Sequence, residues 1–143
     1  MSYLILALRF LTIVPVPGAE AAGPGALGRA AWWFPVVGFA VGACLVAVDR
    51  LLASAFPPLL GAILLVAVWK ILTGGLHLDG LADAIDGIAG RGPERRIAIM
   101  RDSHLGAFGA VALGLCLLIS VGALDAVPAA RRPAVLLLAP AIG

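Results

Sequence analysis

Three aspartates in a strongly apolar chain have the spacing of a metal site. Asp79, Asp83 and Asp86 lie at positions i, i+4 and i+7. An α-helix turns by about 100° per residue, so it would hold them within roughly 60° of one another. Carboxylates that close repel, and each costs about 2.5 to 3.5 kcal/mol near the centre of a bilayer. We therefore expect a positive group among them, and Mg²⁺ binds through a few carboxylates, waters and phosphate oxygens.

A basic segment follows the aspartates directly. It contains Arg91, Arg95, Arg96 and Arg101, and guanidinium groups bind phosphate oxygens in a bidentate manner. An acidic helix face followed by basic residues predicts phosphoryl transfer. A divalent-cation carrier is the alternative outside enzymes, because carboxylates inside a membrane also mark cation paths. The neighbouring guanidinium groups argue against it, since they would repel the cation.

The composition is that of an integral membrane protein. Of 143 residues, 62% are hydrophobic and only 13% are charged, which is far from the average of soluble domains. A net charge of +2 gives no reason to expect a nucleic-acid partner. Cys44 and Cys116 each lie in an apolar run without metal-ligand spacing, so we interpret both as packing thiols.

Long uncharged runs predict the membrane-spanning helices. The expected full spans are Ala31–Val48, Leu59–Leu76 and Leu105–Leu124. The segment from Ser2 to Val14 is too short to cross about 30 Å of hydrocarbon and is expected at the interface. Residues 134–143 provide only half of a further span.

These spans define the expected fold. We predict an all-α polytopic membrane bundle in which residues 1–143 form a single membrane-embedded domain. It would be the N-terminal part of a longer chain, with about three full spans and a truncated fourth. Asp49 and Arg50 are expected to begin a turn that continues to Pro57 and Pro58.

The approach to the aspartates is unusual for a membrane span. Lys70 lies inside the second predicted span, where it either extends its amine to the interface or serves as a cation held near the acidic face or a phosphate. Gly74 and Gly75 then loosen the helix. Residues 73–90 could continue the span, turn back or lie along the interface. The Arg91–Arg101 segment falls on the same side as Arg9 and Arg29, and this side, more basic than the one with Arg50, Arg131 and Arg132, should be cytoplasmic.

Four separated segments resemble one enzyme family. The motif GGLHLDGLADAIDG, the later ERRIAIMRDSHLGAFGA, the opening RFLTIVPVP and the segment WWFPVVG are similar to those of cobalamin synthase, the membrane-bound adenosylcobinamide-GDP ribazoletransferase. This resemblance implies an Mg²⁺-dependent reaction of adenosylcobinamide-GDP with α-ribazole or its 5′-phosphate, which gives adenosylcobalamin or its 5′-phosphate and GMP. It implies a multi-pass protein of the cell inner membrane with a cytoplasmic active site, and leaves a homo-oligomer open.

The resemblance also suggests roles for single residues. Asp79, Asp83 and Asp86 match the acidic motif and would bind metal, with Asp83 or Asp79 as general base. His77 would be a catalytic residue that reaches the substrate from the segment after Gly75, although a structural role carries equal weight.

The remaining polar residues have two interpretations each. Arg95, Arg96 and Arg101 would hold the diphosphate and the departing GMP, while Arg95 and Arg96 also fit a topology signal. Asp102 could be a fourth metal ligand, or it could cap the third span together with Ser103 and His104.

A related enzyme class is the alternative within phosphoryl transfer. CDP-alcohol phosphotransferases also place several aspartates on membrane helices to bind metal and a nucleotide diphosphate. Their motif has an Arg after the Ala at the position where this chain has Asp83, and it continues with two further aspartates that are missing here.

Overall fold

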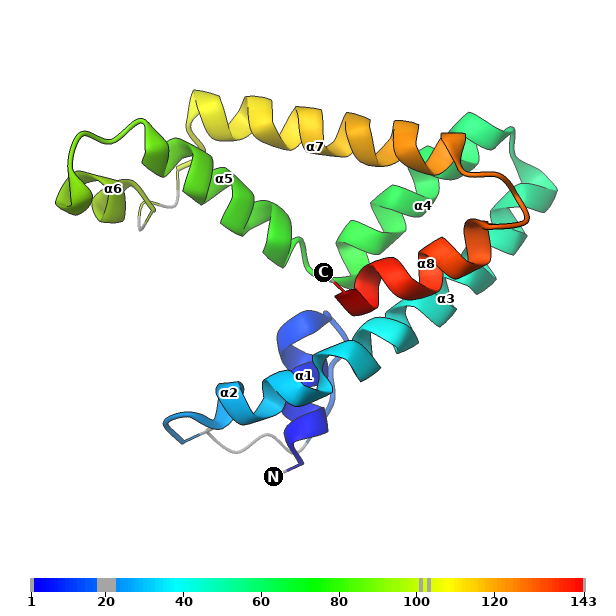
Figure 1. Cartoon of the computed structure of the whole chain (residues 1–143), viewed down its shortest axis with the longest axis horizontal. Coiled ribbons are helices and arrows are strands. Elements are labelled where there is room, and N and C mark those ends of the chain that lie inside the picture. The colour runs from blue at the N-terminus through cyan, green and yellow to red at the C-terminus, as the bar shows by residue number, and fades with distance from the viewer. Residues whose placement is uncertain (1, 18–22, 101, 103, 143) are drawn as a thin grey trace.

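The computed structural model describes residues 2–17, 23–100, 102 and 104–142, and its regular elements over these residues are all helices. Along the chain they are α1 (Tyr3–Leu11), α2 (Ala26–Ala30), the short 3₁₀ helix η1 (Ala31–Trp33), α3 (Phe34–Ala55), α4 (Pro58–Leu72), α5 (Leu76–Ile88), α6 (Pro93–Met100), α7 (Ala107–Ala126) and α8 (Arg132–Ile142). Figure 1 shows α4, α5 and α7 as three sides of an open triangle, with α8 lying along α3. The all-α prediction is confirmed for the described residues.

The first long helix extends beyond its predicted end. Elements α2, η1 and α3 run without a break from Ala26 to Ala55, so the prediction of a turn beginning at Asp49 and Arg50 was wrong. Asp49 does not end the helix, because its carboxylate lies 3.0 Å from Nε of Arg132 in α8, with both side chains largely buried. The helix ends before Pro57, whose ring cannot continue the hydrogen-bond ladder.

Two glycines let α3 and α8 approach closely. Gly38 and Gly42 lie one turn apart on α3. A Cβ atom at Gly38 would overlap the backbone of Pro140 and Ala141, and one at Gly42 would lie 2.6 Å from the carbonyl oxygen of Leu136. Small residues at this spacing are typical of packed membrane helices. The adjoining core contains the buried residues Val41, Leu45, Ala62, Leu65, Val66, Leu124 and Leu136.

A sharp bend separates α4 from α5. The two helices meet at an angle of 87°, and both Gly74 (φ +62°) and Gly75 (φ +68°) adopt the left-handed conformation that other residues avoid. The backbone N–H of Ile13 donates a 3.0 Å hydrogen bond to the carbonyl oxygen of Leu72, so the segment after α1 packs against this bend. Residues 73–90 therefore do not continue the second span as one straight helix, and the re-entrant and interfacial paths both stay predictions.

Span prediction succeeds in part. Ala26–Ala55 and α7 are long and apolar enough to cross a membrane. The bent pair α4 and α5 passes that test only when its two helices are taken together. The second predicted span therefore ends four residues early, at Leu72. The third is found two residues later than predicted, as α7.

Candidate active site

Helix α5 carries all three motif aspartates. It begins after Gly75 and continues to Ile88, so the predicted helical spacing of Asp79, Asp83 and Asp86 is confirmed. Asp79 falls in the first turn, where a carboxylate interacts favourably with the positive end of the helix dipole. The structure nevertheless divides the three side chains between two environments.

Asp79 and Asp83 line a cleft of about 570 Å³ between α5, α7 and the segment that joins α6 to α7. Asp102 and His104 of that segment line the same cleft. Folding thus brings residues separated by about twenty positions to one surface, with the apolar side chains of Met100, Leu105 and Leu113 beside them.

Asp86 joins α5 to the start of α7. Its Oδ2 accepts a 2.9 Å hydrogen bond from the backbone N–H of Gly106, and its Oδ1 accepts a 2.8 Å bond from that of Gly109. Neither glycine has room for a Cβ, because the Asp86 carboxylate occupies that space. Free N–H groups at a helix start need such an acceptor. The observed cap of α7 therefore comes from Asp86 of α5, and not from Asp102, for which a cap is one of the two interpretations of the sequence.

Asp102 and His104 form a pair at the edge of the cleft. Oδ1 of Asp102 lies 2.5 Å from Nδ1 of His104 and also accepts the His104 backbone N–H at 3.1 Å. The side-chain hydrogen bond raises the pKa of His104 above its usual 6.5. The same bond is the main cause that lowers the pKa of Asp102, with a smaller contribution from the charge of Arg95. Ser103 lies outside the described residues.

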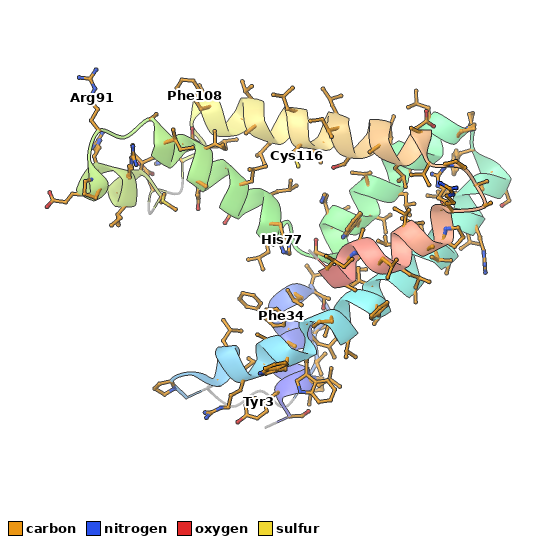
Figure 2. The ribbon with its side chains drawn as sticks, viewed as in Figure 1. Tyr3, Phe34, His77, Arg91, Phe108 and Cys116 are labelled. Carbon is orange, nitrogen blue, oxygen red and sulfur yellow. The ribbon has the colours of Figure 1, made fainter. Side chains whose placement is uncertain are left out.

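Arg91, Arg95 and Arg96 do not line the cleft. Arg95 and Arg96 belong to α6, which packs against α5. Nε of Arg96 donates a 3.1 Å hydrogen bond to the carbonyl oxygen of Gly90. Arg91 extends away from the helices in Figure 2. Arg101 is outside the described residues, so the predicted phosphate-binding role stays a prediction for Arg95, Arg96 and Arg101.

His77 lies in the first turn of α5 but faces a different cavity from Asp79 and Asp83. It lines a second cavity, together with Lys70 and Thr73, and is absent from the lining of the acidic cleft. Nζ of Lys70 is 4.8 Å from the centre of the Trp69 ring. The structure therefore separates His77 from Asp79 and Asp83, and its catalytic role stays a prediction.

The donors present suit a partly hydrated Mg²⁺ better than a closed protein site. Among the described residues, no three His, Cys, Asp or Glu side chains converge as a metal-binding group. Asp79 and Asp83 still share the cleft with Asp102. Mg²⁺ commonly takes only one or two carboxylates and completes its shell with waters and substrate phosphates. Both carboxylate oxygens of Asp86 accept hydrogen bonds from α7, and these bonds would compete with a metal ion. Its metal-binding role stays a prediction.

Sequence reasoning missed two features of this site. His104 was expected only near a helix cap, although it pairs with Asp102 inside the cleft lining. Its i, i+2 spacing from Asp102 was the available signal. The clamp between Asp86 and the two glycines of α7 had no comparable signal, because its partners are 20 and 23 residues apart.

The fold and the cleft together define a class: an apolar helical protein, with two or three membrane-capable helices, that presents paired carboxylates beside basic residues. The family model for cobalamin-5-phosphate synthase matches residues 3–143. The chain belongs to this family.

Several curated relatives support the same assignment, and each is named adenosylcobinamide-GDP ribazoletransferase. The chain is 48% identical to the protein of Geotalea daltonii over 85% of this chain and 50% of the relative. It is 47% identical to that of Pseudomonas paraeruginosa, over 96% of this chain and 56% of the relative. It thus spans about half the length of the curated relatives it matches. No solved structure matches it significantly.

Proposed function

We propose that this chain provides the acidic part of an active site that joins adenosylcobinamide-GDP to α-ribazole or α-ribazole 5′-phosphate. The products are adenosylcobalamin or its 5′-phosphate, together with GMP. The observation that carries the proposal is the shared cleft, which Asp79, Asp83, Asp102 and His104 all line. The names of the curated relatives supply the substrates.

The reaction is a displacement at phosphorus. A ribose hydroxyl oxygen forms a bond to the phosphorus attached to cobinamide, the bond from that phosphorus to the bridging oxygen breaks, and GMP leaves with the electron pair. We assign the hydroxyl proton to Asp83 or Asp79, because carboxylates near a nucleophile serve as general bases. Mg²⁺ held by one or two of the carboxylates of Asp79, Asp83 and Asp102, and completed by waters and phosphate oxygens, would neutralise charge on the transferring phosphate.

Arginines would stabilise the charge that grows on the departing GMP. Arg95 and Arg96 lie on α6, which packs against α5, and the charge of Arg95 acts on Asp102. Guanidinium groups are suited to this role because they bind phosphate oxygens in pairs. We extend the role to Arg101 from its place in the sequence.

We infer further that the cleft lies at the cytoplasmic surface of the inner membrane. The basic residues Arg91, Arg95, Arg96 and Arg101 cluster in one connecting segment, and such segments stay in the cytoplasm. A nucleotide-linked substrate and the released GMP would then exchange directly with the cytoplasm.

The test uses full-length protein in lipid, with and without Mg²⁺, and measures GMP release and corrinoid product. We expect Mg²⁺-dependent turnover that falls at least about 100-fold in Asp83→Asn, the size of a lost general base or ligand. Asp125→Asn is the matched control, because Asp125 is exposed on α7 outside the cleft lining. Unchanged turnover in Asp83→Asn would reject the site. Absence of any corrinoid product from wild type would reject the reaction.

A further inference from the structure

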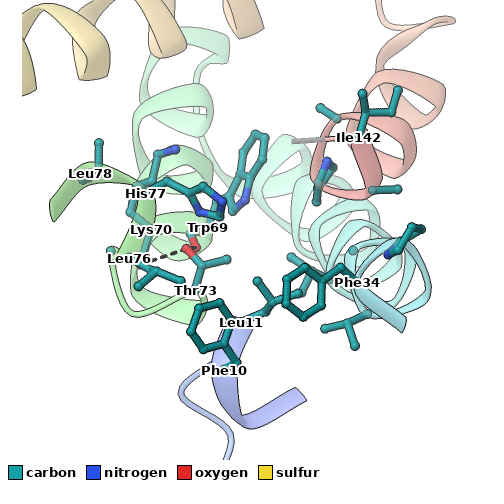
Figure 3. A pocket seen from close by; sticks show the side chains of 18 of the residues that line it. Phe10, Leu11, Phe34, Trp69, Lys70, Thr73, Leu76, His77, Leu78 and Ile142 are labelled. Atoms are coloured by element: carbon teal, nitrogen blue, oxygen red, sulfur yellow. Dashed lines mark hydrogen bonds between the residues drawn. The ribbon is translucent and has the colours of Figure 1, made fainter. Parts of the chain in front are cut away.

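A second cavity lies across the α4–α5 bend from the acidic cleft. Its volume is about 540 Å³, within the range of small-molecule sites. Residues of α1, α3, α4, α5 and α8 line it, and most of them are apolar. Figure 3 shows aromatic rings of Phe10, Phe34 and Trp69 around the space. Phe10 and Phe34 stack on each other, with ring centres 5.7 Å apart and planes within 10°. The cavity therefore has flat apolar walls.

A few polar groups lie on one side of this cavity. Lys70, Thr73 and His77 all belong to the end of α4, the bend or the start of α5. Among the described residues the ion pairs are Asp102 with His104 and Asp49 with Arg132, so Lys70 has no described carboxylate partner. An amine beside an apolar chamber favours a ligand that combines a flat apolar body with an anionic group.

Gly75 connects the two sites. It lines both the aromatic cavity and the acidic cleft, and its φ of +68° makes the bend that separates them. His77 and Asp79, only two residues apart on α5, consequently line opposite sites. A ligand held in the cavity could present a hydroxyl across Gly75 to the carboxylates.

We propose that the aromatic cavity binds the acceptor substrate, a ribonucleoside or its 5′-phosphate with a flat apolar base. The inference rests on the proposed function and adds the place of its second substrate. The base occupies the space between the aromatic walls, the 5′-phosphate lies toward Lys70 and His77, and the ribose hydroxyl faces Asp79 and Asp83.

The size and the apolar walls of the cavity favour the acceptor nucleoside over adenosylcobinamide-GDP. Guanine carries polar groups along its edges, and burying them against apolar side chains without partners is costly. A corrin ring with its amide side chains is several times larger than a nucleoside, so it does not fit about 540 Å³. A base without exocyclic polar groups suits both the size and the walls.

The first experiment fills the cavity of the full-length protein in lipid nanodiscs. Ala139 lines the cavity from α8, and Ala134 is exposed on the same helix outside it. We expect Ala139→Trp to weaken binding of radiolabelled α-ribazole 5′-phosphate at least about tenfold in equilibrium dialysis. The KM for adenosylcobinamide-GDP should change less than about twofold. Ala134→Trp, the matched control, should bind like wild type.

The second variant tests the anion subsite without changing the packing of α8. Lys70→Gln should reduce binding of the 5′-phosphate about tenfold and leave binding of unphosphorylated α-ribazole within about twofold, because only the charged contact is lost. Equal weakening of both ligands, or of neither, would overturn the placement of the phosphate.

The outcomes distinguish the two proposals. Turnover by wild type combined with equal α-ribazole affinity in the Ala139→Trp and Ala134→Trp variants would overturn the cavity while keeping the reaction. A tightly held phospholipid that Ala139→Trp displaces and α-ribazole does not would also overturn it. If wild type forms no corrinoid product yet binds α-ribazole, with the loss confined to Ala139→Trp, the reaction fails and the cavity assignment is supported.

Discussion

Two helix contacts in this protein each depend on a pair of glycines, and they differ in what meets those glycines. At the α3–α8 contact, Gly38 and Gly42 face the backbone of α8. At the α5–α7 contact, Gly106 and Gly109 face the carboxylate of Asp86 and donate their N–H groups to it. The first contact is apolar packing at van der Waals range. The second is a polar clamp beside the candidate active site.

The α3–α8 contact mainly determines the stability of the fold, whereas the α5–α7 contact mainly determines the geometry of the site. Backbone atoms of α8 cannot rotate away from α3, so the first contact tolerates no added atom without moving a helix. The Asp86 side chain can change its rotamer, so the second contact can yield, although it then releases two N–H groups at the start of α7. Because α7 and the segment before it supply Leu113, Asp102 and His104 to the cleft, the polar clamp holds the two sides of the site together.

The largest effect on stability is expected at the apolar contact. In Gly38→Ala the new Cβ overlaps the backbone of Pro140 and Ala141, and we expect the free energy of unfolding to fall by about 3 kcal/mol, the upper end of ordinary overpacking. Thermal unfolding of full-length protein in detergent would measure it. Gly114→Ala is the matched control, because nothing lies within 4 Å of its Cβ. Equal melting temperatures for the two variants would contradict close α3–α8 packing.

A smaller loss is expected when the polar clamp is cut. Asp86→Ala removes the acceptor of two N–H groups at the start of α7, and at about 1 kcal/mol per cap the free energy of unfolding should fall by about 2 kcal/mol. Among the described residues, Asp83 accepts no such hydrogen bonds, so Asp83→Ala should change the free energy of unfolding by less than about 0.5 kcal/mol. The same unfolding assay applies.

The clamp prediction also decides between the two roles of Asp86. A variant Asp86→Ala that keeps its melting temperature but no longer responds to Mg²⁺ would show a metal ligand, as the sequence predicts, and would reject the clamp. Loss of stability without Mg²⁺ present would support the cap.

The sequence allowed prediction of features that depend on one helix at a time. Helical periodicity placed Asp79, Asp83 and Asp86 on one face, uncharged runs located α3 and α7, and Gly74 with Gly75 marked the bend. Each of these follows from local preferences of the residues concerned.

Features that require knowledge of a partner helix could not be predicted. Helical periodicity predicts the face of α5 on which Asp86 lies, but it cannot predict that Gly106 and Gly109 contact this side chain. The 87° bend depends on contacts such as that of Ile13 with Leu72, 59 positions later. Nor does the sequence distinguish the glycines of this region: Gly106 and Gly109 lie in a close contact, whereas Gly114 has nothing within 4 Å of its Cβ position.

The smallest expected effect on stability is the pH dependence of the Asp102–His104 pair. The hydrogen bond with Asp102 raises the pKa of His104 above 6.5, so protonation favours the folded pair. The contribution of the protonated His104 to the stability of the folded state is fully present just below pH 6.5, and it is lost as the pH rises through the higher folded-state pKa of His104. The lowered pKa of Asp102 means that the contribution also fades when the pH falls through that value, below 3.8. Both side chains are exposed, so solvent screening keeps the effect on stability small.

Histidine NMR of the full-length protein without Mg²⁺ measures this pair directly. The chain has two histidines, so His77→Gln leaves one in this part of the protein and makes the His104 signal simple to assign. We expect His104 to titrate above pH 6.5, and Asp102→Asn to return its pKa toward that value, because the amide carries no charge to stabilise the imidazolium. A His104 pKa that is the same in both proteins would show that the pair does not persist in solution.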